Sequence, residues 1–537
     1  MASQPLTSSM QPTDVYGGDE VSAIILDPGF SSVRAGFAGE DTPKSFYTSY
    51  YGVAGDRTIF SDEDIHNPLI KDLEIRNPMS KDGVVEDWDA ATQLWEYAIT
   101  SRLTKFKQGD PRTNGLNDKD ADVEMDAAED EEKPLEEHPL LMTETAWNSS
   151  KNREKSIEIA MENWGCPAFW LARNSVMAAF GAGRATALVI DLGASTASVM
   201  CIHDGLILKK SVQKSNVAGN WVSSQVRSLF NNSEPKVELI PHYMISAKTP
   251  VDAGAPAQAT FQNFDHKISD SFRALEEERV ISEFKESVVQ VYNGPNRLNS
   301  THPSGIPNIE NVKAMPGRVF EFPDGSNQMW GADRMSVVEG MWDERAALPV
   351  AGEPALTKAQ TIPEMVKASI SGVDMDLRAA LLQNVVVTGG TTLLQGFTDR
   401  LHNEMVNMYP GARIKIQAAG LTTERRFGSW VGGSILGSLG TFHQMWISRK
   451  EYEEFGASVV DKRGYQKLAA RLVLNLGFAA YGCEGAGAEK RFCGPVGAAG
   501  GVERCYFGDY REGYVVECEL GVWTGGREGV GGELLAV

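Results

Sequence analysis

The sequence has no long hydrophobic segment and little cysteine. No apolar run reaches the roughly 18 residues that a membrane-spanning helix requires, so we expect no membrane partner. Met1 to Glu20 is polar and ends in acidic residues, which is unlike a signal peptide; we interpret it as a flexible lead-in. Only six cysteines occur among 537 residues, without the Cys/His spacing of a zinc site, so a reducing intracellular setting is the default. Cys166 and Cys201 lie in apolar segments and are predicted to be buried thiols.

Basic clusters are also scarce. Lys209-Lys210 and Arg425-Arg426 are too sparse to form a nuclear import signal. The net charge is -21 and the pI is near 4.9. Because nucleic-acid binding depends on Lys and Arg displacing counterions, we expect no direct, specific DNA binding. An acidic surface suits basic partners such as histones, although solubility alone also explains such a charge.

What is present is a soluble globular composition, with 42% hydrophobic and 23% charged residues. Three short apolar runs end in glycine-bearing turns and predict buried strands: Val21–Gly29, Ala187–Gly193 and Val385–Gly390. The first two continue through an Asp-x-Gly turn into a second strand, so one hairpin recurs after about 160 residues. A duplication at this distance predicts two similar lobes facing each other across a cleft, as the chain length also requires.

Between these strands, Asp89–Thr104 and Glu277–Tyr292 carry apolar residues at helical spacing and predict core-facing helices. Two segments interrupt the pattern. Asn117–Glu137 is acidic and nearly free of large apolar groups, so it cannot bury enough surface to fold. Asn293–Gly317 is rich in Pro, Asn, Ser and Gly and predicts a surface loop.

Four stretches resemble actin: Leu26–Pro43, Asn152–Lys155, Thr388–Thr392 and Trp430–Tyr452. The last is the most specific, because it keeps twenty-odd residues in the family's order. Within the family, the chain is most similar to the fourth class of actin-related proteins, on three motifs: Pro167–Phe169, Asp191–Thr196 and Thr423–Phe427.

The resemblance implies an α/β, actin-like fold (that of actin, sugar kinases and heat-shock ATPases), with two lobes and four subdomains around a nucleotide cleft. It implies a flexible segment at 1–20, an outer lobe at 21–181 with an acidic insertion at 107–137, an inner lobe at 182–427 with a loop insertion at 293–317, a return to the outer lobe at 428–463 and a tail at 464–537.

The family's cofactor is Mg-ATP, and its binding residues carry over by position. Glycine turns let backbone N–H groups approach phosphate, and carboxylates at strand ends face the metal through its waters. Asp27 and Asp191 are the predicted metal-facing residues. The remaining predicted cofactor-binding residues are Gly29, Arg34, Gly193, Lys285, Glu286, Gly389, Gly390, Thr391 and Arg426.

The γ-phosphate end departs from the family. Asn174 and Ser198 stand where actin has the glutamine and histidine that order the attacking water. Ala194 replaces a metal-organising aspartate, and Phe30 replaces a phosphate-binding serine next to Pro28, which lacks an N–H donor. At the nucleoside end, Ser282 replaces an arginine. Since phosphoryl transfer depends on positioning, these changes predict a site that holds nucleotide without hydrolysing it, with no catalytic residue.

The resemblance thus implies a nuclear, non-catalytic, ATP-binding scaffold subunit of chromatin remodelling and histone acetyltransferase complexes, serving transcription regulation and DNA repair. The expected partners are actin, as a heterodimer, and a long scaffold helix docking near Gly433–Trp446 and Gly181–Arg184. Actin's filament-forming loop has no match in Tyr50–Asp62. Histone binding through the acidic insertion is a weaker hypothesis. The alternative is an actin-like ATPase that hydrolyses ATP and polymerises.

The amino-acid composition changes in the tail from Gly464 to Val537. Glycine becomes abundant, and Cys483, Cys493, Cys505 and Cys518 lie too far apart for paired zinc spacing. We interpret the tail as a disordered extension or as non-coding sequence read into the gene. The alternative is a small appended domain, because Tyr506–Trp523 alternates as a strand would.

Overall fold

The computed structural model describes residues 22–104, 133–252, 254–303 and 305–463, and the backbone of two further strands at 504–508 and 515–519. The chain divides into two compact units, 1–474 and 475–537. In the second unit, strands β20 (Arg504–Gly508) and β21 (Val515–Glu519) pair antiparallel. The predicted lead-in, the acidic insertion as far as residue 132 and most of the tail lie outside the described residues, so the predictions for them stay predictions.

The first large sheet is mixed and has six strands in the order β19-β8-β7-β1-β2-β3. Strands β1 and β2 form an antiparallel hairpin, whereas β7 runs parallel to both β1 and β8. Strand β19 comes from far along the chain and pairs antiparallel with β8. The strands are β1 (Ile24–Pro28), β2 (Ser32–Phe37), β3 (Ser45–Thr48), β7 (Leu140–Glu144), β8 (Ala168–Arg173) and β19 (Ile447–Ser448). We call the part built on this sheet the outer lobe.

The second large sheet has the same kind of centre. Its order is β11-β10-β9-β17-β18, and β12 also pairs with β10. Strands β9 and β10 form an antiparallel hairpin, and β17 runs parallel to β9. The strands are β9 (Ala187–Leu192), β10 (Ala197–His203), β11 (Leu206–Ile207), β12 (Gln213–Ser215), β17 (Val385–Thr388) and β18 (Ile416–Ala418). We call the part built on this sheet the inner lobe.

The two hairpins repeat each other in detail. Asp27 lies opposite Arg34 in the first, and Asp191 lies opposite Ser198 in the second. Strands β1, β9 and β17 are almost entirely buried, as their unbroken apolar runs predict for strands with both faces covered. The predicted strands and the predicted repeat are therefore confirmed.

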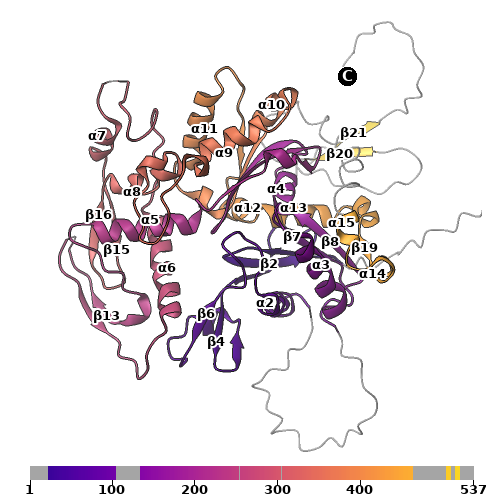
Figure 1. Cartoon of the computed structure of the whole chain (residues 1–537), viewed down its shortest axis with the longest axis horizontal. Helices are drawn as coiled ribbons and strands as arrows, with labels where there is room; N and C mark the ends of the chain where they lie inside the picture. Colours follow the sequence, from indigo (N-terminus) through magenta and orange to yellow (C-terminus); the bar gives the residue numbers. More distant parts are fainter. Residues whose placement is uncertain are drawn as a thin grey trace, which may run out of the picture. The chain divides into compact units, whose positions relative to one another are not determined.

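Helices lie against both sheets (Figure 1), and two separate apolar cores result. The first contains Leu26, Trp95 and Trp164, and the second contains Phe284 and Trp342. The helices are α1 (Asp62–Ile65), α2 (Trp88–Thr100), α3 (Ser150–Glu158), α4 (Asn174–Gly181), α5 (Gly219–Asn232), α6 (Asp270–Ser287), α7 (Asn308–Lys313), α8 (Asp333–Ser336), α9 (Ile362–Ser371), α10 (Met375–Leu382), α11 (Phe397–Met408), α12 (Thr422–Arg426), α13 (Gly428–Gly437), α14 (Arg449–Phe455) and α15 (Val459–Arg463). The mixed sheets and their helices confirm an α/β fold.

The helix predicted at Glu277–Tyr292 forms as α6, but it begins and ends earlier. The cause at its start is a cap: the hydroxyl of Ser269 accepts a hydrogen bond of 3.2 Å from the amide of Phe272. Beyond its end, Val288 and Val291 are still buried, so the apolar spacing overran the helix. The helix predicted at Asp89–Thr104 forms as α2 with its expected face buried through Ile99, but it ends at Thr100, four residues early, and Leu103 lies beyond it.

Three small antiparallel sheets complete the first unit. Strands β4 (Tyr51–Ala54), β5 (Arg57–Ile59) and β6 (Glu74–Arg76) belong to the outer lobe and lie beside α6 (Figure 1). The hydroxyl of Ser271 on α6 accepts a hydrogen bond of 2.9 Å from the amide of Ile75 on β6. The other pairs are β13 (Ile245–Thr249) with β14 (Gln258–Phe261), and β15 (Arg318–Glu321) with β16 (Asn327–Trp330).

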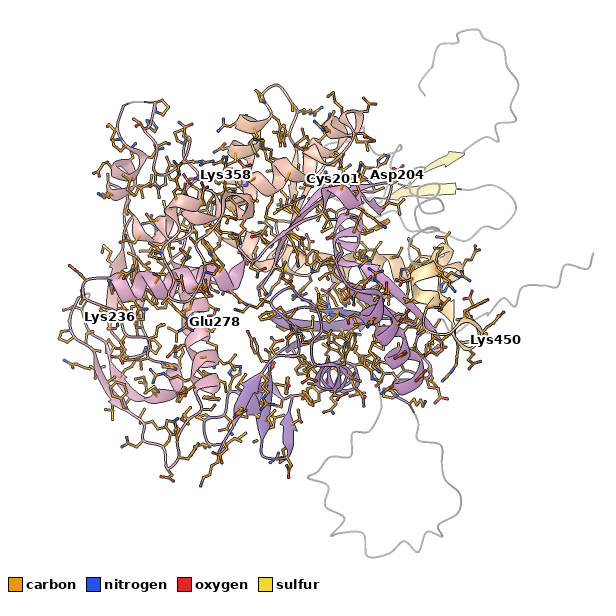
Figure 2. The ribbon with its side chains drawn as sticks, viewed as in Figure 1. Cys201, Asp204, Lys236, Glu278, Lys358 and Lys450 are labelled. Atoms are coloured by element: carbon orange, nitrogen blue, oxygen red, sulfur yellow. The ribbon has the colours of Figure 1, made fainter. Side chains whose placement is uncertain are left out.

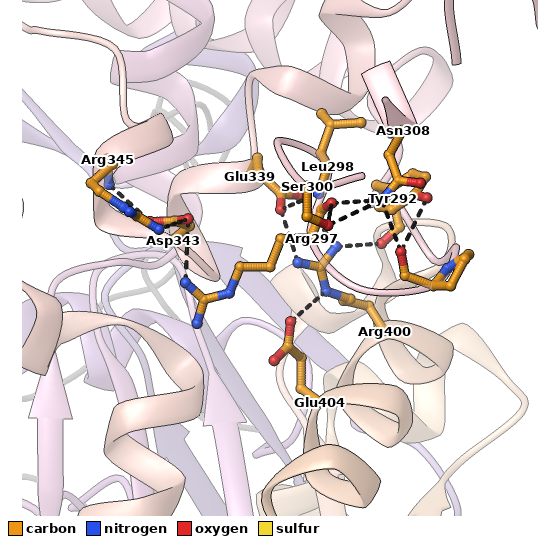
Figure 3. A network of polar contacts seen from close by, with 11 residues as sticks. Tyr292, Arg297, Leu298, Ser300, Asn308, Glu339, Asp343, Arg345, Arg400 and Glu404 are labelled. Atoms are coloured by element: carbon orange, nitrogen blue, oxygen red, sulfur yellow. Dashed lines mark hydrogen bonds and ion pairs between the residues drawn. The ribbon is translucent and has the colours of Figure 1, made fainter. Parts of the chain in front are cut away.

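The predicted loop insertion at 293–317 contains helix α7 and has a buried anchor. The side chain of Asn308 is fully buried, and its Nδ2 donates to the carbonyl oxygens of Pro295 at 2.9 Å and Arg297 at 2.8 Å. Nearby, the buried guanidinium of Arg400 pairs with the buried carboxylate of Glu339 at 2.8 Å (Figure 3). Polar contacts thus order a segment whose composition alone indicates only a loop.

Cys166 and Cys201 are buried free thiols, as predicted, and burial raises the pKa of Cys166 to about 12. Among the helices in the described ranges, none has both the length and the hydropathy that a membrane crossing requires.

Candidate functional site

One cavity of about 730 Å³ is lined by residues of both lobes. The turn after β1 and the turn after β9 contribute to it, together with residues of α4, α5, α6 and α12. All of the predicted cofactor-binding residues line this one cavity: Asp27, Gly29, Arg34, Asp191, Gly193, Lys285, Glu286, Gly389, Gly390, Thr391 and Arg426. Tertiary structure therefore brings together residues that are up to about 400 positions apart in the sequence.

The two duplicated turns have the same hydrogen bond. The amide of Gly29 donates to the carbonyl oxygen of Ser32 at 3.0 Å, and the amide of Gly193 donates to the carbonyl oxygen of Thr196 at 3.0 Å. The amides of these two glycines are thus used inside their own turns. They shape the loops rather than remaining available to a ligand.

The amides that follow each glycine are the available donors. In the described part of the chain, the backbone N–H groups of Phe30, Ser31, Ala194 and Ser195 have no hydrogen-bond partner. All four residues line the cavity. Successive free amides in a turn form a concave anion site, so this arrangement fits phosphate oxygens.

A third turn follows β17 and requires glycine. Gly389 has φ +93°, and a Cβ there would lie 2.2 Å from the carbonyl oxygen of Leu192. The hydroxyl of Thr391 donates a hydrogen bond of 2.8 Å to the carbonyl oxygen of Gly193. The third turn is thus fastened to the second, and Gly390 next to it has open space where a Cβ would stand.

Two carboxylates and one guanidinium dominate the electrostatics. Asp27 is buried, accepts a hydrogen bond of 2.5 Å from the hydroxyl of Thr143 and forms an ion pair of 2.7 Å with Arg34. Burial, with a further contribution from the negative charge of Asp27, raises the pKa of Asp191 to about 6. Such a pair of carboxylates is chemically suited to a hydrated divalent cation, although no group of three or more metal-ligating side chains occurs among the described residues.

The guanidinium of Arg34 points toward the carboxylate of Asp27, whereas the sequence predicts that it contacts phosphate. Its guanidinium bonds to Asp27 and to the hydroxyl of Ser32 at 3.1 Å, and it lies 5.4 Å from the ring centre of Phe427. Its Nε atom is buried without a partner in the described residues.

The predicted nucleoside end lies on α6 and α12. The ammonium of Lys285 is held at 2.6 Å by the hydroxyl of Ser223 and at 3.1 Å by the carboxylate of Glu278. Arg426 stacks over the ring of Phe46 at 5.3 Å, and burial lowers the pKa of its guanidinium. The residues are therefore at the cavity as predicted, but Lys285 already has protein partners.

The substituted residues are also at the cavity. Asn174, Ser198, Ala194 and Phe30 all line it. The carboxamide oxygen of Asn174 accepts a hydrogen bond of 2.8 Å from the amide of Ser175, so that oxygen is used by the start of its own helix. No histidine occurs among the described residues that line the cavity.

Sequence reasoning missed several lining residues. Glu278 lies seven positions before Lys285 on one helix, a spacing that puts both on one face and that would have pointed to it. No sequence pattern pointed to the loop at Lys81 and Asp82, which is not part of the cavity lining but joins the lobes. Asp82 forms an ion pair of 2.8 Å with Lys214 of the inner lobe, and the carbonyl oxygen of Lys81 accepts a hydrogen bond of 3.2 Å from Thr196.

A two-lobed α/β protein with duplicated glycine turns around one cavity is the architecture that the resemblance implied. The family model described as Actin matches residues 18–465. The protein named Actin-related protein 4 from Gibberella zeae is 59% identical over 477 residues, covering 86% of this chain and 100% of its own length. The proteins of that name from Neurospora crassa and Arabidopsis thaliana are 57% and 32% identical, and each match covers at least 84% of this chain and 99% of the relative.

The chain therefore belongs to the actin family. The names of these relatives confirm the predicted resemblance to the fourth class of actin-related proteins, and the family match confirms the actin-like fold.

Proposed function

We propose that this protein is a non-catalytic, ATP-binding scaffold subunit of nuclear chromatin remodelling and histone acetyltransferase complexes, which supports transcription regulation and DNA repair. It pairs with actin on a helical segment of a larger subunit. Membership of the actin family supports nucleotide binding, and the similarity to proteins named Actin-related protein 4 supports the class.

The cavity supports Mg-ATP as the ligand. The free amides after Gly29 and Gly193 suit phosphate oxygens. Asp27 and Asp191 would hold the magnesium ion through its waters. When bound, the metal ion would neutralise phosphate charge that the two carboxylates otherwise repel.

The orientation of Asn174 is the observation that carries the non-catalytic proposal. A water-ordering side chain needs a free polar group aimed into the cavity, but the carboxamide oxygen of Asn174 bonds the amide of Ser175. Ser198 has too short a side chain to replace an imidazole. Because a displacement of about 1 Å can cost roughly a hundredfold in rate, this site binds without efficient turnover.

Two regions of the protein support the proposal that it is a subunit that does not form filaments. Where actin has a filament-forming loop, the described residues form the tight hairpin of β4 and β5, which turns at Gly55 with φ +60°. Gly432 of α13 approaches α4 so closely that a Cβ would lie 1.8 Å from the carbonyl oxygen of Met177. The proposed partner helix would dock beside this closely packed helix pair, near Gly433–Trp446.

Binding and turnover should be measured on the isolated protein. Millimolar Mg-ATP is expected to raise the melting temperature by mass action, and single-turnover hydrolysis is expected to be slower than that of actin. The double variant N174Q/S198H restores both water-ordering side chains and should hydrolyse at least about tenfold faster. Hydrolysis by the unmodified protein at the rate of actin would support the alternative, a polymerising ATPase.

The partner proposal needs a separate experiment. Purification of the tagged protein from nuclei is expected to recover actin together with a remodeller or acetyltransferase subunit. Filament formation by the protein alone, in salt that polymerises actin, would contradict the proposal. Histone affinity should be compared before and after deletion of the acidic run Asn117–Glu137, and an unchanged affinity would remove this run as the histone site.

A further inference from the structure

The α6 wall of the cavity contains a lysine whose charge is already compensated. Lys285 donates to the hydroxyl of Ser223 at 2.6 Å, to the carboxylate of Glu278 at 3.1 Å and, at the longer distance of 3.4 Å, to the carbonyl oxygen of Gly219. An ammonium has three N–H donors, and each has an acceptor here. The ammonium is therefore held in the seam between α5 and α6.

Glu278 is the residue that holds it there. Glu278, labelled in Figure 2, lies on α6 seven residues before Lys285, a spacing of two helical turns, and its carboxylate also contacts the hydroxyl of Ser223. The side chain is 30% exposed and lines the cavity, so its charge is not confined to the seam. The positive charge of Lys285 is thus matched by a carboxylate at contact distance.

The negative charge of Glu278 also acts across the cavity. Tyr50 belongs to the outer lobe and lines the same cavity. Burial chiefly, and then the charge of Glu278, raises the pKa of Tyr50. With Glu286 also at the cavity, the α6 residues that line it carry two carboxylates and one lysine. Arg227 of α5 also pairs with Glu278, at 3.8 Å, but it lies outside the cavity lining, so the charge of this wall disfavours an anion.

We propose that Glu278 is a positioning residue that sets the affinity of the cavity for an anionic nucleotide, by holding Lys285 against α5 and cancelling its charge. This inference rests on the proposed nucleotide binding and names the residue that sets its affinity. Glu278 weakens the binding of a phosphate-bearing ligand and leaves the binding of the uncharged nucleoside unaffected.

The substitution Glu278→Gln removes the charge and keeps the size and one acceptor oxygen. In the full-length protein, the Kd for Mg-ATP is expected to fall about tenfold at low salt, because removing the negative charge of Glu278 lowers the electrostatic repulsion of the phosphates. The Kd for adenosine should stay within about twofold. Raising the salt concentration should reduce the gain for Mg-ATP, because salt screens the interaction.

Glu283→Gln is the matched control. It removes the same charge from the same helix, but Glu283 lies outside the cavity, is half exposed and pairs with His242 at 3.0 Å. This variant should change neither Kd by more than about twofold. The opposite substitution, Lys285→Met, should weaken Mg-ATP binding, because it removes a positive charge from the cavity wall.

The possible results distinguish a failure of the role of Glu278 from a failure of the proposed nucleotide binding. Equal changes for Mg-ATP and adenosine in the Glu278→Gln variant, or weaker Mg-ATP binding, would overturn the role of Glu278 while the proposed function stands. If the unsubstituted protein bound neither ligand, the proposed function would fail and this inference with it.

Discussion

Ser269 joins the two lobes of the first unit to each other through Leu73. Its hydroxyl caps α6 by accepting from Phe272 and donates a hydrogen bond of 2.5 Å to the carbonyl oxygen of Leu73 in the outer lobe. Around this contact lies an apolar cluster shared by both lobes, in which Phe272 of α6 packs with Ile59, Ile65, Leu73 and Ile75. His66 and Glu276 form a further contact beside it. We call these contacts, together with the apolar cluster, the clasp, because they tie α6 of the inner lobe to the outer lobe.

Loosening the clasp should release nucleotide faster. Phe272→Ala is expected to cost about 3–5 kcal/mol of stability and to raise the dissociation rate of a fluorescent ATP analogue at least about tenfold, since about 1.4 kcal/mol lost from the closed state suffices for that factor. Phe397→Ala is the control, because Phe397 is equally buried within the inner-lobe core. Similar release rates in the two variants would show that the clasp does not hold the cleft shut.

In the absence of ligand, the carboxylate of Asp191 should lower the free energy of unfolding of the protein. Its raised pKa means that the folded state holds a proton more tightly than the unfolded state, so stability falls as pH rises from about 4 to about 6. Asp191→Asn should therefore gain up to about 3 kcal/mol at pH 7 without magnesium, and nothing below about pH 4. The same variant should lose most of the thermal shift with Mg-ATP. Urea unfolding across this pH range is the measurement, with the exposed Asp56→Asn as control.

Arg400 should be essential to the inner lobe. The guanidinium is fully buried, pairs with Glu339 at 2.8 Å and with Glu404 at 2.9 Å, and donates to the carbonyl oxygen of Tyr292 at 2.9 Å (Figure 3). Arg400→Met leaves buried carboxylates unpaired, so we expect a loss of about 3–5 kcal/mol in urea unfolding. Lys313→Met, which removes an exposed lysine paired at 2.9 Å with the exposed Glu310 in the same lobe, should cost less than about 1 kcal/mol.

The close contact between α13 and α4 should tolerate no side chain at Gly432. Because a Cβ would lie 1.8 Å from the carbonyl oxygen of Met177, Gly432→Ala is expected to destabilise the protein by more than about 3 kcal/mol. Gly440→Ala has open space around its added methyl group and should change stability by less than about 1 kcal/mol. Thermal unfolding of both variants tests this, and equal melting temperatures would contradict the observed contact.

Local chemistry was predictable from the sequence wherever one segment carried the whole signal. Strands β1, β9 and β17 and the repeated Asp-x-Gly turn follow from short apolar runs and glycine, because backbone geometry at a tight turn depends on a few adjacent residues. The family order of those motifs then indicated which residues meet, and all of them line one cavity.

Only the tertiary structure decided the state of each side chain. Arg34 pairs with Asp27, and Lys285 is held by Ser223 and Glu278, since partners come from neighbouring strands and helices that spacing along the chain does not show. The start of α6 likewise depended on Ser269, whose hydroxyl also bonds the other lobe. The sequence determined the turns that can surround a ligand, whereas packing determined which charges remain free to bind it, because compensation of a charge depends on distance in space.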